Sequence, residues 1–213
     1  MTENQRKTAG VPTLKRLPLY LRLLRQMKAE GETYASGTVV ANSLGLDPIV
    51  VRKDLAITGA VGRPRLGFPM DEIIYAIEEF LGWTNTSDAF LVGVGNLGRA
   101  LLRYRGFDQH GLHILAGFDT NSTIVGDTIA GKEIFHIDRM AEKAKSEHVQ
   151  IGILTVSPQN AQSAADAMVK VGIRAIWNFT PITLDVPDNV ILQREELGSS
   201  LAVLSHRLLT DNN

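Results

Sequence analysis

Hydrophobic and polar positions follow two different patterns along the 213-residue chain. After residue 87, short apolar runs alternate with segments of helical spacing, which is typical of a mostly parallel sheet with right-handed crossover helices. The predicted strands lie near residues 89–94, 113–118, 151–156, 174–178 and 190–193. The predicted helices cover residues 97–105, 137–147 and 159–171. Segments 124–126 and 129–131 are interpreted as a loop and a turn.

Before residue 84 the apolar spacing is helical. The four predicted helices cover residues 13–28, 36–44, 48–57 and 71–81. The first should begin just before Pro18 or bend there, because proline lacks the N–H of a helix interior. Ser36 and Asp47 are N-cap signals for the second and third helices, and proline follows Asp47 at the first helical position.

The second and third helices predict a helix-turn-helix, whose last helix enters the major groove of DNA. The glycine-bounded segment 62–67 follows as the wing of a winged helix and carries two arginines. Residues 1–70 hold eleven basic and five acidic side chains, a net charge of +6, whereas the remainder carries −7. A solvated basic face on a helical bundle is the alternative, but the combined signals favour DNA binding. The predicted DNA-binding residues are Pro48, Ile49, Val50, Arg52, Lys53, Arg63 and Arg65.

A G-x-G-x-x-G sequence follows one predicted strand and precedes a helix, the context in which this motif binds a pyrophosphate. Its residues are Gly93, Val94, Gly95, Asn96, Leu97 and Gly98. The glycines allow a tight turn, close approach of the ligand, and close packing of helix on strand. Asp119 ends the next predicted strand, 24 residues after Gly95, near the spacing of a ribose-binding carboxylate. A carboxylate there repels a 2′-phosphate, so NAD(H) is favoured over NADP(H), and the combination argues against an ordinary glycine-rich turn.

Two more loops leave predicted strands at the edge where such sheets bind ligands. They span residues 155–162 and 178–181, and both would border the nicotinamide half of the pocket. An ordinary strand–helix loop is an equal alternative for each on spacing alone. The predicted cofactor-binding residues in these loops are Thr155, Val156, Ser157, Asn178, Phe179, Thr180 and Pro181.

Composition removes several classes of function. The chain has no cysteine, which excludes disulfides, a thiol nucleophile and a thiolate metal site. No apolar run approaches the roughly 20 residues of a membrane span. The polar N-terminus lacks a hydrophobic signal segment, so we expect a cytoplasmic protein with neither a membrane partner nor a metal.

An NAD-dependent oxidoreductase with an accessory basic domain is the alternative function. It would need a proton donor beside the nicotinamide, yet none of the four tyrosines has a lysine four residues later. The five histidines are scattered, with no acidic partner at a recognisable spacing. A CoA-binding module is a second alternative, against which Asp119 favours the ribose hydroxyls of NAD. We therefore predict no catalytic residues.

The predicted fold class is α/β with three segments. Residues 1–84 form a winged-helix DNA-binding domain, residues 85–194 a Rossmann-like doubly wound parallel sheet that binds NAD(H), and residues 195–213 a C-terminal dimerisation helix. This helix carries a stripe of leucines at 197, 201, 204 and 208. Such a stripe usually packs on its own domain, but here the helix follows a complete sheet and suits donation to a second subunit.

Several short motifs, modest singly, are specific in their order along the chain. They are residues 15–22, 51–55, 93–101, Phe118-Asp119, Thr155-Val156 with Ala161-Gln162, and Asn178-Phe179 with Pro181. In these the chain resembles the Rex family of redox-sensing transcriptional repressors over nearly its whole length. The resemblance implies a homodimer with exchanged C-terminal helices that binds palindromic operator DNA and senses NADH against NAD+.

The resemblance also implies a role for three switch residues. Tyr104 matches a tyrosine near the nicotinamide. Arg16 matches an arginine that, in the DNA-bound form, pairs with an acidic residue near the C-terminal helix of the other subunit. Glu196 stands at that acidic position, where the family commonly has aspartate. In the wing, Pro64-Arg65 stands where the family has an Arg-Gly pair.

Overall fold

The computed structural model describes residues 8–85 and 87–210. The chain divides into two compact units, Met1–Asn85 and Thr86–Asn213, at a point next to the boundary expected near residue 84. The expected domains also include residues 1–7, 86 and 211–213, which lie outside the described range.

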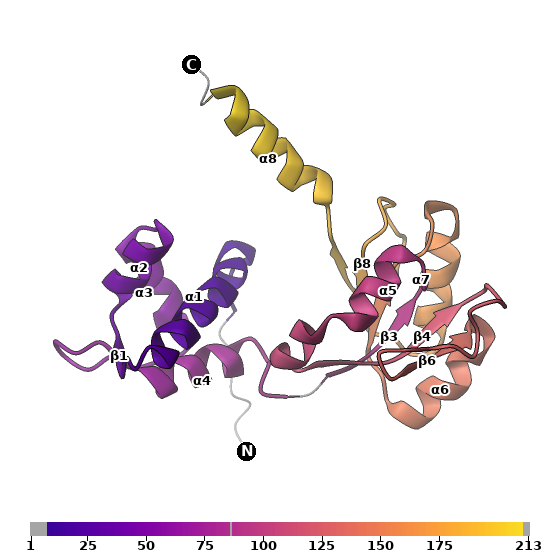
Figure 1. The fold of residues 1–213 in the computed structure, drawn as a ribbon, viewed down its shortest axis with the longest axis horizontal. Helices are drawn as coiled ribbons and strands as arrows, with labels where there is room; N and C mark the ends of the chain where they lie inside the picture. Colours follow the sequence, from indigo (N-terminus) through magenta and orange to yellow (C-terminus); the bar gives the residue numbers. More distant parts are fainter. Residues whose placement is uncertain (1–7, 86, 211–213) are drawn as a thin grey trace. The chain divides into compact units, whose positions relative to one another are not determined.

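Helices form most of the first unit (Figure 1). Its described elements are α1 (Val11–Ala29), β1 (Tyr34–Ala35), α2 (Gly37–Leu44), α3 (Pro48–Ile57), β2 (Phe68–Pro69) and α4 (Met70–Phe80). Both predicted N-caps are confirmed: the Ser36 side chain accepts a hydrogen bond from the Val39 N–H and the Asp47 side chain from the Ile49 N–H. β1 and β2 pair antiparallel and form the base of the wing.

The first helix passes through Pro18 instead of beginning beside it. It starts at Val11, so one of the two outcomes expected at Pro18, a start just before it, is wrong. Burial explains the continuation: Leu17, Tyr20 and Leu24 are fully buried against the other helices. Packing of this face outweighs the hydrogen bond that proline cannot donate.

The second unit is built on a seven-stranded sheet within the described residues, in the order β5-β6-β4-β3-β7-β8-β9. The strands are β3 (Ser87–Val92), β4 (Leu112–Asp119), β5 (Thr128–Ile129), β6 (Lys132–His136), β7 (Ile151–Leu154), β8 (Ala175–Asn178) and β9 (Ile191–Arg194). Neighbouring strands pair parallel from β6 to β9, and only the edge strand β5 is antiparallel. The predicted doubly wound parallel sheet is confirmed.

Two strands of this sheet were not predicted. β5 and β6 form a hairpin whose turn is Ala130-Gly131, both with positive φ. Interpreting residues 129–131 as a turn was therefore wrong for Ile129, which is buried in the strand. These strands are too short to show a periodic pattern, and it is burial of Ile129 and Ile134 in the assembled sheet that stabilises them.

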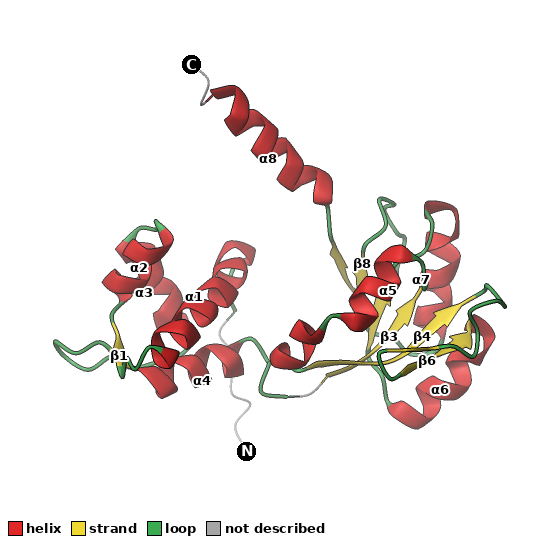
Figure 2. Cartoon of the chain, viewed as in Figure 1, coloured by secondary structure: helices red, strands yellow, loops and turns green. Residues whose placement is uncertain are grey.

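Helices cover both faces of the sheet (Figure 2). They are α5 (Asn96–Arg103), α6 (Met140–Glu147) and α7 (Ala161–Lys170). Successive residues of β3 face opposite sides: Phe90 packs in one cluster with Met140 of α6 and Met168 of α7, and Leu91 in another with Leu102 of α5. Three-residue 3-10 turns precede α6 and α7, which shortens both predicted helices at their N-terminal ends.

The last helix, α8 (Leu197–Thr210), confirms the predicted terminal helix. Its leucines are strongly solvent-exposed in the single chain, with 63% of Leu201 and 57% of Leu204 accessible. The side chain of Leu197 lies outside the described set. In the part of the chain that the structure describes, no helix has both the length and the hydrophobicity to cross a bilayer.

Candidate functional site

A pocket of about 830 Å³ opens at the carboxyl ends of β3, β4 and β7, bounded by α6 and α7. This volume lies within the range of roughly 300–1,000 Å³ typical of ligand pockets. Six of the predicted cofactor-binding residues line it: Gly93, Gly95, Asp119, Thr155, Val156 and Ser157. The strand edge thus brings together three predicted segments that are distant in sequence.

Each of the three motif glycines fits its position for a different structural reason. Gly93 has a φ of +98°, and an added Cβ would lie 2.6 Å from the Val156 nitrogen. At Gly98 an added Cβ would overlap the carbonyl oxygen of Gly93. Gly95, by contrast, has no atom within 4 Å of such a Cβ, although it lines the pocket. No neighbour among the described residues requires glycine at position 95, so this open space fits the close approach of a ligand phosphate.

Hydrogen bonds hold the glycine loop to its neighbours. The Thr155 hydroxyl donates to the Gly93 carbonyl at 2.6 Å, and the Thr155 N–H donates to the Val92 carbonyl at 2.9 Å. Within this segment Val94 and Gly98 are buried, whereas Asn96 and Leu97 are exposed at the start of α5. The N-terminal end of α5 is therefore free to face an anion.

Asp119 is oriented by backbone groups on both of its oxygens. Oδ2 accepts from the Val94 N–H at 2.7 Å and Oδ1 accepts from the Asn121 N–H at 2.9 Å. The carboxylate is half-buried and lines the pocket, and each oxygen retains a lone pair. It can therefore accept the hydroxyls of a ribose, as its spacing predicts.

Sequence reasoning missed one wall of the pocket. Ile137, Asp138, Met140 and Ala141 line it and directly follow β6. The signal that could have identified them is their position at the carboxyl end of a parallel strand, but that strand was itself not predicted.

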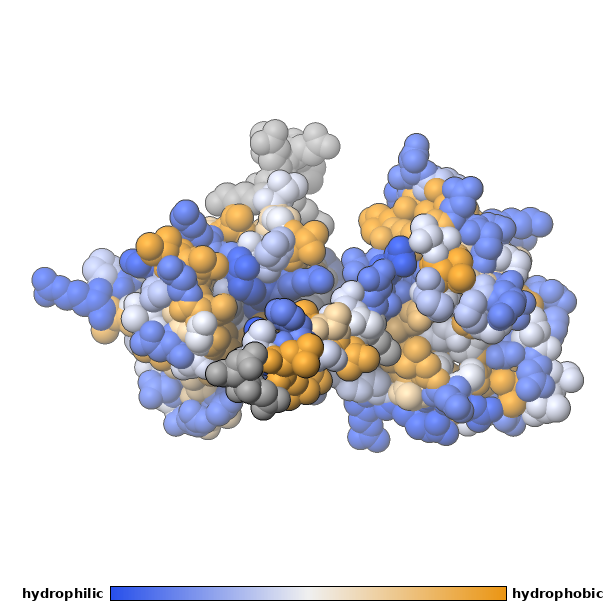
Figure 3. All heavy atoms as spheres, turned by 90° about the horizontal axis from the view of Figure 1, so that it is seen from above, coloured by the Kyte–Doolittle hydropathy of each residue, from blue (hydrophilic) through white to orange (hydrophobic). Residues whose placement is uncertain are grey.

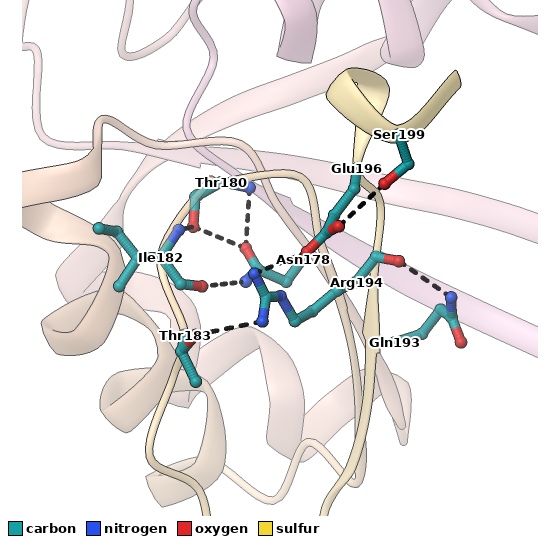
Figure 4. A network of polar contacts seen from close by, with 8 residues as sticks. All are labelled: Asn178, Thr180, Ile182, Thr183, Gln193, Arg194, Glu196 and Ser199. Atoms are coloured by element: carbon teal, nitrogen blue, oxygen red, sulfur yellow. Dashed lines mark hydrogen bonds and ion pairs between the residues drawn. The ribbon is translucent and has the colours of Figure 1, made fainter. Parts of the chain in front are cut away.

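The segment 178–181 does not line this pocket. Asn178 is fully buried and Thr180 nearly so. The Asn178 Oδ1 accepts from both the N–H and the hydroxyl of Thr180 at 2.8 Å, and its Nδ2 donates to the Ile182 carbonyl at 3.0 Å (Figure 4). These two side chains hold the loop in shape. Their contact with a cofactor, and that of Phe179 and Pro181, stays a prediction. Pro181 is exposed.

Tyr104 and Phe179 belong to a chain of four aromatic rings. Ring centroids are separated by 4.9 Å between Tyr104 and Phe107, 5.6 Å between Phe107 and Trp177, and 4.9 Å between Trp177 and Phe179. Three of these rings pack against the α5 face of the sheet, whereas the pocket is bounded by α6 and α7. The predicted cofactor-binding residues therefore lie on both faces of the sheet.

In the first unit, α3 exposes the predicted DNA-reading side chains. Val51 and Leu55 are buried, while Ile49, Val50, Arg52 and Lys53 are exposed and Pro48 is half-buried. The Arg52 Nε donates to the Pro48 carbonyl at 3.2 Å, so one side of its guanidinium is oriented by its own helix.

The wing turns at Arg63 to Leu66, where the Leu66 N–H donates to the Arg63 carbonyl. Pro64 stands second in this turn and Arg65 third, with a φ of +65°, which matches a type II turn and explains how the chain turns without glycine there. Arg63 binds the Tyr34 hydroxyl at 3.0 Å and Glu72 at 3.3 Å. Arg65 is exposed and has no such bond among the described residues. The wing ends in a hydrophilic tip at the left edge of Figure 3.

Arg16 is bound within its own unit, by a residue to which the sequence assigned no role. Asp54 of α3 is buried, and it accepts bonds from the Arg16 Nε at 2.7 Å and Nη2 at 2.9 Å. The Tyr20 hydroxyl donates to it at 2.7 Å and the Thr13 hydroxyl at 2.9 Å. Glu196 binds Arg194 at 2.9 Å. Pairing of Arg16 with Glu196 of a second subunit remains a prediction.

This cluster shifts the pKa of each titratable member. The hydrogen bonds to Asp54 raise the pKa of Arg16 above its ordinary value. Burial, with the hydrogen bond to Asp54, raises the pKa of Tyr20 to about 12. Burial alone would raise the pKa of Asp54, but hydrogen bonds from Arg16, Tyr20 and Thr13 outweigh it and hold that pKa below its usual range. The carboxylate thus stays ionised and joins α1 to the back of α3.

Side chains that could together ligate a metal are not found within residues 8–85 and 87–210. The candidate functional residues lie in two parts of the chain. One is a winged helix whose exposed helix α3 is basic, and the other is a Rossmann-type sheet with a pocket at its glycine loop. Together they define a DNA-binding protein that also binds a nucleotide.

Comparison with known proteins identifies the family. Residues 10–56 match the family described as putative DNA-binding protein N-terminus, and residues 84–182 match the family described as CoA binding domain. The redox-sensing transcriptional repressor Rex of Treponema denticola is 48% identical over 200 residues, covering 94% of this chain and 95% of that protein. This chain belongs to the Rex family.

Solved structures of a Rex-family repressor, RSP, have the same fold. RSP in complex with beta-NAD+ and operator DNA superposes with a TM-score of 0.89 at 32% identity, covering 96% of this chain and 94% of that one. RSP in complex with beta-NADH superposes with a TM-score of 0.86 at 31% identity, covering 96% of each chain.

Proposed function

We propose that this protein is a redox-sensing transcriptional repressor that binds palindromic operator DNA as a homodimer and is released when NADH occupies the Rossmann unit. The observation that carries this function is the presence, in one chain, of an exposed basic α3 and a glycine loop with open space at Gly95. The RSP structures with NAD+ and operator DNA, and with NADH, support the same ligands here. A repressor of chromosomal genes is expected in the cytoplasm.

Release requires two states of the dimer. In one state the two α3 helices are spaced by one DNA turn, and in the other they are out of register. NADH must bind the second state better than NAD+ does, because a ligand with equal affinity for both states shifts nothing. A 100-fold loss of DNA affinity corresponds to about 2.7 kcal/mol of coupling. NADH and NAD+ differ in charge at the nicotinamide, so we place the discrimination there, near Tyr104.

The exposed apolar face of α8 supports the homodimer. Leu201, Leu204 and Leu209 are each more than half accessible in the single chain. Burial of such a face against a second copy is the expected way to remove it from water. Exchange of α8 between subunits remains a proposal that this face supports.

The proposal includes the absence of catalytic turnover. An NAD-dependent oxidoreductase would consume NADH in the presence of a small carbonyl substrate, whereas a sensor only binds it. Incubation of the protein with NADH and a panel of small aldehydes and ketones, followed at the NADH absorbance band, is expected to show no consumption. Steady turnover would favour the enzyme.

The central test is a mobility shift of palindromic operator DNA titrated separately with NADH and NAD+. We expect NADH at micromolar concentration to dissociate the complex and NAD+ to leave it intact. Equal effects of the two nucleotides would contradict the function.

Substitution on α3 should separate the two units functionally. Arg52→Ala or Lys53→Ala is expected to weaken operator binding by about 10-fold and to lower its salt dependence, because each removes one exposed cation from the DNA-facing helix. NADH affinity should be unchanged. Arg174→Ala, which removes an exposed arginine of the second unit, is the charge-matched control and should leave operator affinity unaltered. Loss of NADH affinity in the α3 variants would show that the two activities are not separable.

A further inference from the structure

Two side chains join β8 and the loop after it to the residues just before α8. Trp177, in β8, donates its indole N–H to the Glu195 carboxylate at 3.0 Å. Arg194, at the end of β9, donates from Nη1 to the Thr183 hydroxyl at 3.1 Å and pairs through Nη2 with Glu196 at 2.9 Å (Figure 4). We call residues 194–196 the neck, because they run from the last residue of β9 to the residue before α8.

Further bonds extend the neck in both directions. The Glu195 N–H donates to the Asn178 carbonyl at 2.9 Å, so the neck continues the sheet register beside the buried Asn178 loop. On the other side, the Ser199 hydroxyl in the first turn of α8 donates to Glu196 at 3.1 Å. A continuous set of bonds therefore runs from the loop at 178–183 to α8.

Arg194 is the branch point of this network. Its guanidinium fork reaches the loop with one nitrogen and the neck with another, a geometry that lysine cannot reproduce. Its Nε is buried and has no hydrogen-bond partner among the described residues. An unpartnered N–H is unfavourable, which indicates that the side chain is held here by the two bonds of its outer nitrogens.

Trp177 is the second connection. Its ring lies between Phe107 and Phe179 in the aromatic chain that begins at Tyr104. A displacement of Phe179 or of Tyr104 would move this ring within a packed cluster, and with it the indole N–H bound to Glu195.

We propose that Arg194 and Trp177 are positioning residues that transmit nucleotide occupancy of the Rossmann unit to the orientation of α8. The inference rests on the proposed function in that NADH must act on the loop at 178–183 or on Tyr104. Because α8 exposes its apolar face, its direction at the neck decides where that face meets a second copy of the chain. The two side chains therefore set the strength of the coupling and not the affinity for either ligand alone.

The test measures three quantities on the full-length protein: NADH affinity by calorimetry, operator affinity with NAD+, and operator affinity with NADH. In Arg194→Gln and Trp177→Phe we expect the first two to stay within about 3-fold of the unaltered protein, while the NADH-induced loss of operator affinity shrinks by about 10-fold. Arg174→Gln is the matched arginine control, with unaltered coupling expected.

Two substitutions of Glu195, one conservative and one not, separate loss of coupling from loss of the fold. Glu195→Gln keeps an oxygen that accepts the Trp177 N–H and should retain the coupling, whereas Glu195→Leu should lose it. Thermal unfolding of each variant shows whether the fold is intact. A purely structural role would lower stability in the variants without this split between nucleotide binding and DNA release.

Two results would overturn the inference, and they are distinguishable. If Arg194→Gln, Trp177→Phe and Glu195→Leu all bound NADH normally and released operator DNA as fully as the unaltered protein, the inference would be overturned and the proposed function would stand. Absence of NADH binding by the unaltered protein would overturn it together with the proposed function.

Discussion

Gly98→Ala is expected to weaken NADH binding severely. Gly98 is buried, and a Cβ there would overlap the Gly93 carbonyl oxygen and lie 3.0 Å from the Thr155 hydroxyl. That carbonyl already accepts the 2.6 Å bond from Thr155, so neither group can move without displacing the other. The loop and the start of α5 must separate, with an expected loss of about 100-fold or more in NADH affinity and about 2 kcal/mol in stability.

Gly95→Ala is the matched comparison in the same loop. Its Cβ would meet no atom within 4 Å in the part of the chain that the structure describes, so the unfolding temperature should not fall. Because that Cβ would occupy space next to the ligand phosphates, NADH affinity should still drop. Calorimetric titration and thermal unfolding of both variants check this contrast. A Gly98→Ala protein with unaltered affinity and stability would contradict the account of the loop, as would a Gly95→Ala protein that binds normally.

The second large effect is expected at Asp54. In Asp54→Asn, a neutral amide replaces the carboxylate to which Arg16, Tyr20 and Thr13 all donate. The charge of the Arg16 guanidinium then has no carboxylate partner in this cluster. Removal of one member of a buried ion pair typically costs about 3 kcal/mol, which we expect for the first unit. Operator binding should weaken as well, since Asp54 joins the reading helix α3 to α1, while NADH affinity should be retained.

The readout for Asp54 is selective for one unit. Trp83 packs against the core of the first unit and Trp177 against that of the second, so urea unfolding followed by Trp83 emission in a Trp177→Phe background reports on the first. Tyr20→Phe, which removes only one hydroxyl donor, is the milder control, with an expected loss of about 1 kcal/mol. Equal stability of Asp54→Asn and the unaltered protein would refute the role assigned to the cluster.

The same cluster predicts how stability depends on pH. The pKa of Asp54 is lower in the folded state than in the unfolded chain. Its contribution is therefore present above the ordinary carboxyl pKa and is lost as the pH falls through the folded value. The pKa of Tyr20 is raised to about 12, so its contribution is present below the ordinary tyrosine value and is lost as the pH rises toward 12. Asp54→Asn should remove the carboxylate contribution on the acid side.

Much of the architecture could be predicted from local chemistry. The N-caps Ser36 and Asp47 and the strand–glycine–helix segment at 93–98 depend on hydrogen bonds and φ angles of nearby residues, so their signals are short and legible in sequence. The two short strands at 128–136 could not be predicted, because their stability comes from pairing beside β4 and not from their own periodicity.

In the candidate site, too, features set by local sequence could be predicted, whereas contacts between distant segments could not. The expected groups at Asp119 and Thr155 do line the pocket, because the carboxyl ends of parallel strands meet at one edge. The bonds between Asn178 and Thr180 inside their loop could not be read from the sequence, and the contact of these residues with a cofactor stays a prediction. Arg16 carried a role from family resemblance alone, and the partner it has in this chain, Asp54, is 38 residues away in sequence.

The amino-acid sequence by itself determined the two-part organisation, the glycine loop, the carboxylate of Asp119 at the pocket and the exposed basic helix α3, since each depends on residue type and short spacing. Only the tertiary structure decided which polar groups are free and which are already bonded. Asp54 is bound to Arg16, and Asn178 is hydrogen-bonded to Thr180 of its own loop. In the neck, Glu195 accepts from Trp177 and Glu196 pairs with Arg194. The physical reason is that a buried polar group must find a partner, and the partner is chosen by packing between segments that sequence distance does not reveal.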